Sequence, residues 1–193
     1  MRVIGGEARG RPLRAPTSPA VRPTSDRVRE AIFDVLSSLG EVDGATVLDC
    51  FAGSGALGIE AISRGASTAT FVDVDRRAVA CVEANLSRVG FSGRPGVRVV
   101  CSETLGFLAT SRTRYDLALV DPPYRFDHWG PLLSRLSAGC AVLESSSPVD
   151  VPDRFAVHRV YRHGGTLVTV VTEASAPGPV EPVGERPDEE LRR

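Results

Sequence analysis

Short apolar runs alternate with amphipathic stretches from about residue 45 to residue 144. The runs have the length of buried strands, and the stretches between them carry apolar residues at helical spacing. Alternation of this kind predicts βαβ units, and hence a largely parallel sheet with helices on both faces. Strands are expected at 46–50, 68–73, 97–101, 117–121 and 141–144, and helices at 56–63, 76–89, 103–109 and 130–136.

The two ends of the chain follow other patterns. Residues 2–14 contain two short strand-like runs around a glycine-containing turn, which predicts a basic hairpin, and 24–39 has the apolar face of a helix. The β-rich runs 155–161 and 166–173 predict a second hairpin. The rest is rich in proline and acidic residues, a composition typical of a disordered tail. We therefore expect an N-terminal extension over 1–40, an α/β domain over 41–173 and a tail over 174–193.

The composition is that of a globular protein that needs no covalent staple. The chain has 193 residues, of which 42% are hydrophobic and 24% charged, and a domain of this size buries enough surface to fold without a disulfide or a metal. Its four cysteines are scattered without a CxxC pair, so we expect no disulfide framework and no metal site. No apolar run reaches the roughly 18 residues of a membrane span. We expect a cytoplasmic protein without membrane contact.

Positive charge gathers at the beginning of the chain, although the formal net charge is only −1. Residues 1–30 contain seven arginines against three acidic residues. Such a cluster favours an arm that binds a polyanion, because arginine makes bidentate contacts with phosphate. A solvated surface is the alternative interpretation. The arginines that we expect at a nucleic acid are Arg2, Arg9, Arg11, Arg22 and Arg27.

A glycine-rich turn follows the first expected strand and opens a helix. It reads Asp49-Cys-Phe-Ala-Gly53-Ser-Gly55-Ala-Leu-Gly58. Glycines let the backbone approach a ligand closely, and an acid about 20 residues later, here Asp73, can accept the ribose hydroxyls of a nucleoside. The glycine spacing also fits a dinucleotide, but Asp49 would repel a pyrophosphate. The same carboxylate suits the ammonium group of an amino-acid tail, directly or through water, which favours S-adenosylmethionine.

A second motif, Asp121-Pro-Pro-Tyr124, ends the fourth expected strand. Ligands of an open α/β sheet bind beyond the carboxyl ends of the strands, so this motif should face the same cleft as the glycine turn. Pro122 and Pro123 fix a rigid turn with carbonyls free to accept hydrogen bonds. Asp121 adds a carboxylate acceptor, and Tyr124 offers a ring on which a base can stack.

These groups suit one reaction. The exocyclic amino nitrogen of a base is a poor nucleophile, because its lone pair is delocalised into the ring. Two acceptors on its hydrogens, the Asp121 carboxylate and a carbonyl near Pro122, favour the pyramidal geometry that attack requires. They gain strength as charge develops on the nitrogen, so they stabilise the transition state preferentially. The motif therefore indicates methyl transfer to an amino group.

Together with the beginning of the chain, these motifs resemble the RsmD-type family, bacterial methyltransferases that act on guanine N2 of 16S ribosomal RNA. The likeness covers about residues 1–172. The glycine turn and the second motif are shared by many amino-methyltransferases, so the N-terminal segments are what point to this family. Many members carry glutamate where this chain has Asp73, which has a shorter reach. The matching N-terminal segments are Arg2-Val-Ile-Gly-Gly and Arg22-Pro-Thr-Ser-Asp-Arg27.

The resemblance implies a fold, a cofactor and a substrate. The fold is α/β, a Rossmann-like class I methyltransferase with a mostly parallel seven-stranded sheet and an antiparallel last strand. A small N-terminal basic hairpin and helix would precede it and help to hold RNA. The cofactor is S-adenosyl-L-methionine. The substrate is a specific guanine of 16S ribosomal RNA, which we expect a monomer to meet in a small-subunit or assembly particle.

The candidate residues fall into two groups. The segment after the third strand, which ends at Glu103, should approach the adenine of the cofactor; Phe51 either lines the pocket or belongs to the core. Glu144 ends the next strand and could add polarity to the cleft. The expected catalytic residues are Asp121, Pro122, Pro123 and Tyr124, and the expected cofactor-binding residues are Asp49, Phe51, Gly53, Gly55, Asp73 and Glu103.

Three other functions are compatible with parts of the pattern. An adenine-N6 methyltransferase acting on DNA or RNA would use the same chemistry, although DNA enzymes usually need a larger target-recognition region. A nicotinamide-dependent oxidoreductase fits the glycine turn and leaves Asp121-Pro-Pro-Tyr124 unexplained. A non-catalytic RNA-binding or assembly protein is disfavoured by the intact second motif.

Overall fold

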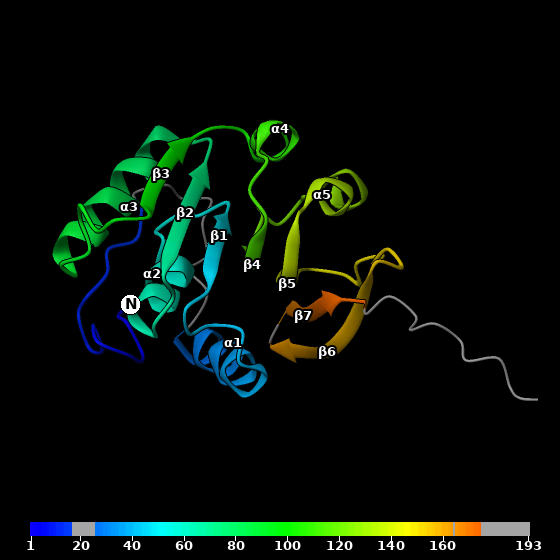
Figure 1. Ribbon diagram of the computed structural model, residues 1–193, viewed down its shortest axis with the longest axis horizontal. Helices are drawn as coiled ribbons and strands as arrows, with labels where there is room; N and C mark the ends of the chain where they lie inside the picture. Colours follow the sequence, from blue (N-terminus) through cyan, green and yellow to red (C-terminus); the bar gives the residue numbers. More distant parts are fainter. Residues whose placement is uncertain (17–25, 164, 175–193) are drawn as a thin grey trace, which may run out of the picture.

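The computed structural model describes residues 1–16, 26–163 and 165–174, and these residues form one seven-stranded sheet (Figure 1). The strand order is β3-β2-β1-β4-β5-β7-β6, and the first five of these strands are parallel. The last strand of the chain, β7, runs antiparallel to both β5 and β6, as predicted. The strands are β1 (Thr46–Cys50), β2 (Thr68–Asp73), β3 (Val97–Cys101), β4 (Tyr115–Val120), β5 (Ala138–Ser145), β6 (Phe155–His163) and β7 (Thr166–Glu173).

Helices cover both faces of the sheet, because every buried strand carries apolar side chains on both sides. One hydrophobic cluster joins the sheet to α1, α2 and α3, and a second joins it to α4 and α5. The helices are α1 (Asp26–Leu39), α2 (Ala56–Ser63), α3 (Arg76–Arg88), α4 (Thr104–Thr110) and α5 (Trp129–Arg135). None of the described helices is long and apolar enough to cross a bilayer.

The strands and helices expected from residue 45 onward all occur, with bounds that differ by a few residues at most. The largest difference is β5, which begins at Ala138 where the sequence predicted residue 141. Pairing with β4 explains the extension, since Ala138 lies opposite Tyr115 and the ladder holds residues that are not themselves strongly apolar. The predicted beginning of α1 at Thr24 lies outside the described residues.

Residues 1–16, the N-terminal arm, differ from the hairpin that the sequence predicted. The chain does turn back on itself, with Val3 N donating to Arg11 O at 3.0 Å, but only one isolated bridge, between Arg2 and Pro12, forms. Two strands do not develop, because the backbone amides of Ile4 and Gly5 donate to the side chain of α2 residue Glu60 and not to the returning half of the arm. The prediction of two strands was therefore wrong.

The turn of the arm lies at the edge of the sheet where the parallel strands begin. Helices α2 and α3 start beyond the carboxyl ends of β1 and β2 and end at the opposite edge. The arm contacts those far ends: Glu7 N donates to Ser63 O at 2.8 Å, and the Arg11 guanidinium donates to Val89 O. Its buried side chains share the cluster of α1 and the sheet, so the predicted boundary at residue 40 does not separate two cores.

Candidate active site

The glycine turn joins β1 to α2 at the carboxyl edge of the sheet. Gly55 precedes the helix with a φ of 75°, a conformation that side chains with a Cβ disfavour. Gly58 has a different role: a Cβ there would collide with the Phe71 ring and the Asp49 carboxylate. The third glycine therefore allows α2 to pack closely on β2, and the first two shape the turn.

Asp49 lies beneath this turn with only 2% of its surface exposed. Its Oδ2 accepts a hydrogen bond from the Gly58 amide at 2.9 Å. Burial raises the pKa of Asp49 well above its ordinary range, and the nearby charges of Asp121 and Asp73 raise it further, while the Gly58 bond opposes the shift. The charged form of this carboxyl is therefore less favourable than it would be in water, and a cation beside it would stabilise that form.

Asp73 ties the end of β2 to the glycine turn. Its Oδ2 accepts from Gly53 N and its Oδ1 from Asp75 N, both at 2.8 Å. A carboxylate has about four acceptor positions, so Asp73 retains capacity for ribose hydroxyls. The structure thus brings together Gly53 and Asp73, which the sequence analysis assigned to one nucleoside.

Four acids form a row along the carboxyl edge, at or directly after the ends of β2, β1, β4 and β5. Asp49 pairs with Phe71 on β2 and with Leu119 on β4. Phe71 and Leu119 lie two residues before Asp73 and Asp121. The β4–β5 register pairs Val120 with Leu143, so the residues that follow them, Asp121 and Glu144, come next to each other. Side chains two residues apart on a strand point to the same face, so the four acids share the face that α2 covers. The spacing in the sequence gives no sign of this row.

Asp121-Pro-Pro-Tyr124 lines a surface pocket beyond β4 and β5. Tyr124 is 73% exposed, so its ring is accessible to a base from solution. The expectation that both proline carbonyls are free needs correction, because Pro123 O accepts from Phe126 N at 2.9 Å and closes the turn. The carbonyl of Pro122 therefore becomes the candidate acceptor beside the Asp121 carboxylate. The other lining residues are Phe126, Trp129, Glu144, Ser145, Ser146 and Thr166.

An aromatic cluster connects the glycine turn to this pocket. The Phe51 ring meets the Phe126 ring edge-on at 5.2 Å between centroids, and Phe126 meets Trp129 at 5.3 Å. Phe51 has a φ of 58°, which costs a non-glycine residue roughly 1–2 kcal/mol. Packing of its half-buried ring against the pocket loop offsets this strain, so Phe51 lies between the two motifs rather than deep in the core.

Glu103 caps α4. Its carboxylate accepts from Leu105 N at 3.0 Å and from Gly106 N at 2.6 Å. The segment before it is held near Asp73, since Ser102 N donates to Asp73 O at 2.9 Å. Glu103 therefore lies at the carboxyl edge of the sheet near Asp73, where it also stabilises the beginning of α4.

The arginines expected at nucleic acid do not gather at the pocket. Arg2, Arg9 and Arg11 are exposed on the N-terminal arm, whose turn lies at the opposite edge of the sheet. Arg2 also lies 3.9 Å from Asp26. Arg27 is exposed near the beginning of α1. Arg22 lies outside the described residues.

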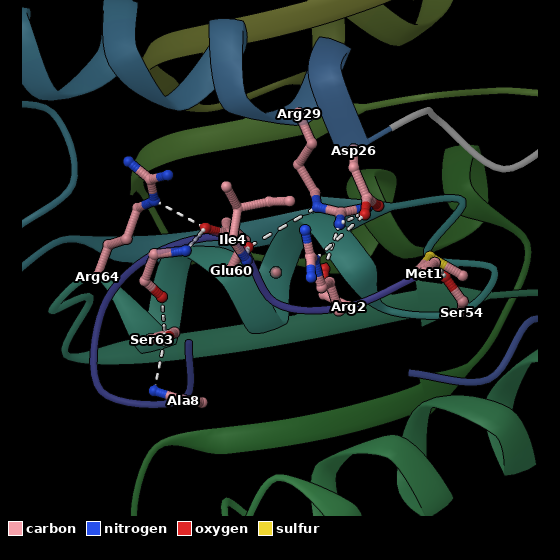
Figure 2. A network of polar contacts seen from close by, with 12 residues as sticks. Met1, Arg2, Ile4, Ala8, Asp26, Arg29, Ser54, Glu60, Ser63 and Arg64 are labelled. Atoms are coloured by element: carbon pink, nitrogen blue, oxygen red, sulfur yellow. Dashed lines mark hydrogen bonds and ion pairs between the residues drawn. The ribbon is translucent and has the colours of Figure 1, made fainter. Parts of the chain in front are cut away.

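A buried polar network joins the arm, α1 and α2, and the sequence analysis missed it (Figure 2). Glu60 is fully buried and accepts from Ile4 N at 2.8 Å, Gly5 N at 2.7 Å and Arg64 Nε at 2.8 Å. The fully buried Arg29 lies 3.7 Å from Glu60 and 2.9 Å from Asp26. A glutamate inside the apolar run of α2 was the available signal.

Asn85 connects the arm to the glycine turn. Its amide nitrogen donates to Ser54 O at 2.8 Å and to Arg14 O at 2.9 Å, and its oxygen accepts from Arg14 N at 2.9 Å. A fully buried asparagine with three such bonds fixes backbone positions. The end of the arm therefore helps to hold the glycine turn at the carboxyl edge, although the turn of the arm lies at the opposite edge of the sheet.

The chain is similar to methyltransferases in sequence and in fold. A family model described as conserved hypothetical protein 95 matches residues 1–171. Ribosomal RNA small subunit methyltransferase D of Escherichia coli (strain K12) is 46% identical over 125 residues, which cover 65% of this chain and 61% of that protein. YlbH of Bacillus subtilis (strain 168), provisionally named an rRNA methyltransferase, is 36% identical over 161 residues, which cover 79% of this chain and 86% of that protein.

Solved structures show the same architecture. The E. coli protein yhhF, provisionally named a methyltransferase, superposes with a TM-score of 0.79 and 34% identity. The superposition covers 91% of this chain and 99% of that one. The seven-stranded sheet with its antiparallel last strand is therefore the Rossmann-like sheet of these proteins.

Proposed function

The chain belongs to the family described as conserved hypothetical protein 95, which its motifs identify as the RsmD type. From this premise we propose that it transfers a methyl group from S-adenosylmethionine to N2 of a guanine in 16S ribosomal RNA. One observation carries the proposal: the pocket of Asp121-Pro-Pro-Tyr124 and the glycine turn lie at the same edge of the sheet, joined by the Phe51–Phe126 contact. A nucleoside and an acceptor base can then meet at that edge.

The cofactor edge has groups that suit S-adenosylmethionine. The buried Asp49 carboxyl, whose pKa is raised, would gain the ammonium of the methionine tail as its counter-charge. Asp73 would accept the ribose hydroxyls while it holds Gly53. Phe51 and the segment that ends at Glu103 flank the remaining side, where the adenine would lie.

The catalytic groups would act on the target base. When bound, S-adenosylmethionine supplies an electrophilic methyl group, whose carbon–sulfur bond breaks as the nitrogen–carbon bond forms. The Asp121 carboxylate and the Pro122 carbonyl accept the two N2 hydrogens and direct the nitrogen lone pair at the methyl carbon. Tyr124 stacks on the base and offsets the cost of unstacking it from RNA. Asp121 then accepts the proton that the methylated N2 loses.

The finer features of the substrate belong to the same proposal. We place the protein in the cytoplasm as a monomer that acts on a small-subunit or assembly particle. Arg2, Arg9, Arg11, Arg22 and Arg27 would contact phosphates of that particle. Because the turn of the arm, with Arg9 and Arg11, lies at the opposite edge of the sheet from the pocket, the contacts of these two arginines would orient the particle from a distance and would not touch the target base.

The test uses the full chain with labelled S-adenosylmethionine, undermethylated small subunits and the same 16S RNA freed of protein. Mass-spectrometric mapping should find N2-methylguanosine at one position, with subunits as the better substrate. N6-methyladenosine in RNA or DNA would replace the proposed activity with the alternative methyltransferase. Absence of label transfer to any nucleic acid would refute a methyltransferase of either kind.

A further inference from the structure

The outermost strand of the sheet, β6, ends beside the pocket and has no task in the proposed function. Among the described strands only β7 pairs with it, so its other side is an exposed edge (Figure 1). Because β6 runs antiparallel to β7, and β7 antiparallel to β5, β6 ends at the carboxyl edge. Its last residue, His163, pairs with Thr166, which lines the pocket. The strand therefore runs along the side of the sheet up to the place where the target base would bind.

This strand is positively charged in a chain whose formal net charge is −1. Its two arginines, Arg159 and Arg162, are exposed, and within residues 1–16, 26–163 and 165–174 neither forms an ion pair with a carboxylate. Residues 154–172 contain no acidic residue. Charged side chains on an exposed edge discourage pairing with another chain, and either sign serves that purpose. Charge of one sign only goes beyond that need and indicates a polyanion.

The phosphates on either side of the target nucleotide are the polyanion that this position fits. A base that enters the pocket must leave its stack, which brings the neighbouring phosphates close to the pocket. Strand residues are about 3.3 Å apart, so Arg162 lies about 3 Å and Arg159 about 13 Å before the end of β6. Three residues separate the two arginines, so their side chains leave opposite faces of the strand and can contact backbone on both sides of it. The turn of the N-terminal arm lies at the opposite edge of the sheet.

We propose that Arg159 and Arg162 bind the RNA phosphates that flank the target base and so hold the RNA over the pocket. The inference rests on the proposed function and names the part of the substrate that β6 contacts. Guanidinium groups suit this task because they make bidentate contacts with phosphate oxygens. Val157 and Val160 are also exposed on β6, at 52% and 54%, so a protein strand of the particle is the competing occupant. The unopposed positive charge favours RNA over such a strand.

The test measures how the full-length protein binds undermethylated small subunits, and 16S RNA freed of protein, at several salt concentrations. The double variant Arg159→Ala/Arg162→Ala loses two phosphate contacts, and each contributes about 0.7–0.9 to the slope of log affinity against log salt. The slope should therefore decrease by about 1.4–1.8 for subunits and for RNA. Between about 50 and 200 mM salt, the affinity of the wild type should fall about 7- to 12-fold more than that of the variant.

Arg112→Ala/Arg135→Ala is the matched control, because it removes the same charge from another part of the surface. Arg112 follows α4 and Arg135 ends α5, so both lie at the edge where the parallel strands begin, and both are exposed. This variant should keep the wild-type slope. Arg159→Lys/Arg162→Lys retains the charges and should also keep it. Thermal unfolding and the affinity for S-adenosylmethionine should match the wild type in all three variants.

The position of the contact is tested with an RNA spanning the mapped target position, in which neutral methylphosphonates replace the two phosphates beside the target base. The wild type should bind this RNA more weakly than the unmodified one, and Arg159→Ala/Arg162→Ala should bind both alike. The proposal is overturned if the wild type binds both equally, or if the slope of this variant is unchanged or matches that of the control. A loss seen with subunits but not with free RNA would assign β6 to a protein partner and also overturn it. Failure of the wild type to methylate subunits or RNA would instead refute the proposed function.

Discussion

The two edges of the sheet are built in opposite ways. At the edge where the parallel strands begin, the ends of α2 and α3 hold the turn of the N-terminal arm, and the buried carboxylate of Glu60 accepts three hydrogen bonds behind it. At the carboxyl edge, Tyr124 is 73% exposed and Asp49 is buried with its charge disfavoured. At the first edge the Glu60 carboxylate has its acceptors filled from within the chain, and at the second the buried Asp49 carboxyl is a group that a cationic ligand would compensate.

This difference separates stability from function. Groups that are already hydrogen-bonded inside the protein stabilise the fold and have few free donor or acceptor positions for a ligand. Groups held in an unfavourable state, such as the buried Asp49 or the left-handed backbone of Phe51, lower stability but are ready for a partner. We therefore expect substitutions at the arm to change unfolding and substitutions at the carboxyl edge to change binding or turnover.

The largest effect is expected for Glu60→Ala. It removes the acceptor of two backbone amides and leaves the buried Arg29 with Asp26 as its remaining counter-charge, and breaking a buried pair of this kind costs about 3–5 kcal/mol. Denaturant unfolding measures this loss. Glu7→Ala is the control, since its exposed ion pair with Arg94 should contribute less than about 1 kcal/mol. Equal losses in both variants would contradict the stabilising role of the buried Glu60 network.

Asp121→Ala should have the next largest effect, on turnover alone. Removal of an acceptor aimed at developing charge should slow single-turnover methylation by about 100-fold or more. The affinity for S-adenosylmethionine, measured by calorimetry, should barely change because Asp121 faces the base. Near-normal turnover would remove Asp121 from the chemistry.

Tyr124 should distinguish stacking from hydrogen bonding. Stacking of a base on an aromatic ring contributes roughly 1–3 kcal/mol, so Tyr124→Ala should slow methylation by about 5- to 150-fold. Tyr124→Phe keeps the ring and should lose much less. The exposed ring makes little contribution to the fold, so unfolding temperatures should stay close to wild type. Equal slowing by both substitutions would argue for the hydroxyl and against stacking.

Asp49 predicts a pH dependence of cofactor binding. Because its pKa is raised, the free protein keeps this carboxyl protonated to higher pH, and the stability that the neutral form contributes is lost as pH rises through that pKa. An ammonium partner requires the ionised form, so affinity should rise by up to about tenfold per pH unit below the pKa. Calorimetry in buffers of different ionisation enthalpy should detect one proton released. Asp49→Asn should abolish both effects; a pH profile unchanged by it would place the ammonium elsewhere.

The smallest effect is expected for Arg9→Glu on the turn of the arm. Loss of a phosphate contact should weaken RNA binding a few-fold for any sequence and lower the salt-dependence slope by about 1. Arg125→Glu, beside Tyr124, offers the comparison at the pocket edge. Filter binding at several salt concentrations measures both. An unchanged slope for Arg9→Glu would leave the arm with its structural task only.

Much of the fold followed from the sequence because its elements are locally encoded. The apolar runs and helical spacing fixed strands such as Thr46–Cys50 and helices such as Ala56–Ser63 to within a few residues. The N-terminal arm was the exception. Its glycines and short apolar runs favour a hairpin. The backbone amides of Ile4 and Gly5, however, donate to the Glu60 carboxylate of α2, more than 50 residues away in the sequence, and not to an opposite strand.

By itself the sequence determined the order of the strands and helices, the glycine turn and the Asp-Pro-Pro-Tyr motif, since these depend on neighbours along the chain. Only the tertiary structure decided which acids stand together. Asp49, Asp73, Asp121 and Glu144 lie at or directly after the ends of four strands, and their alignment depends on strand order and register. Register is set by hydrogen bonds and side-chain packing between distant segments, which local periodicity does not specify.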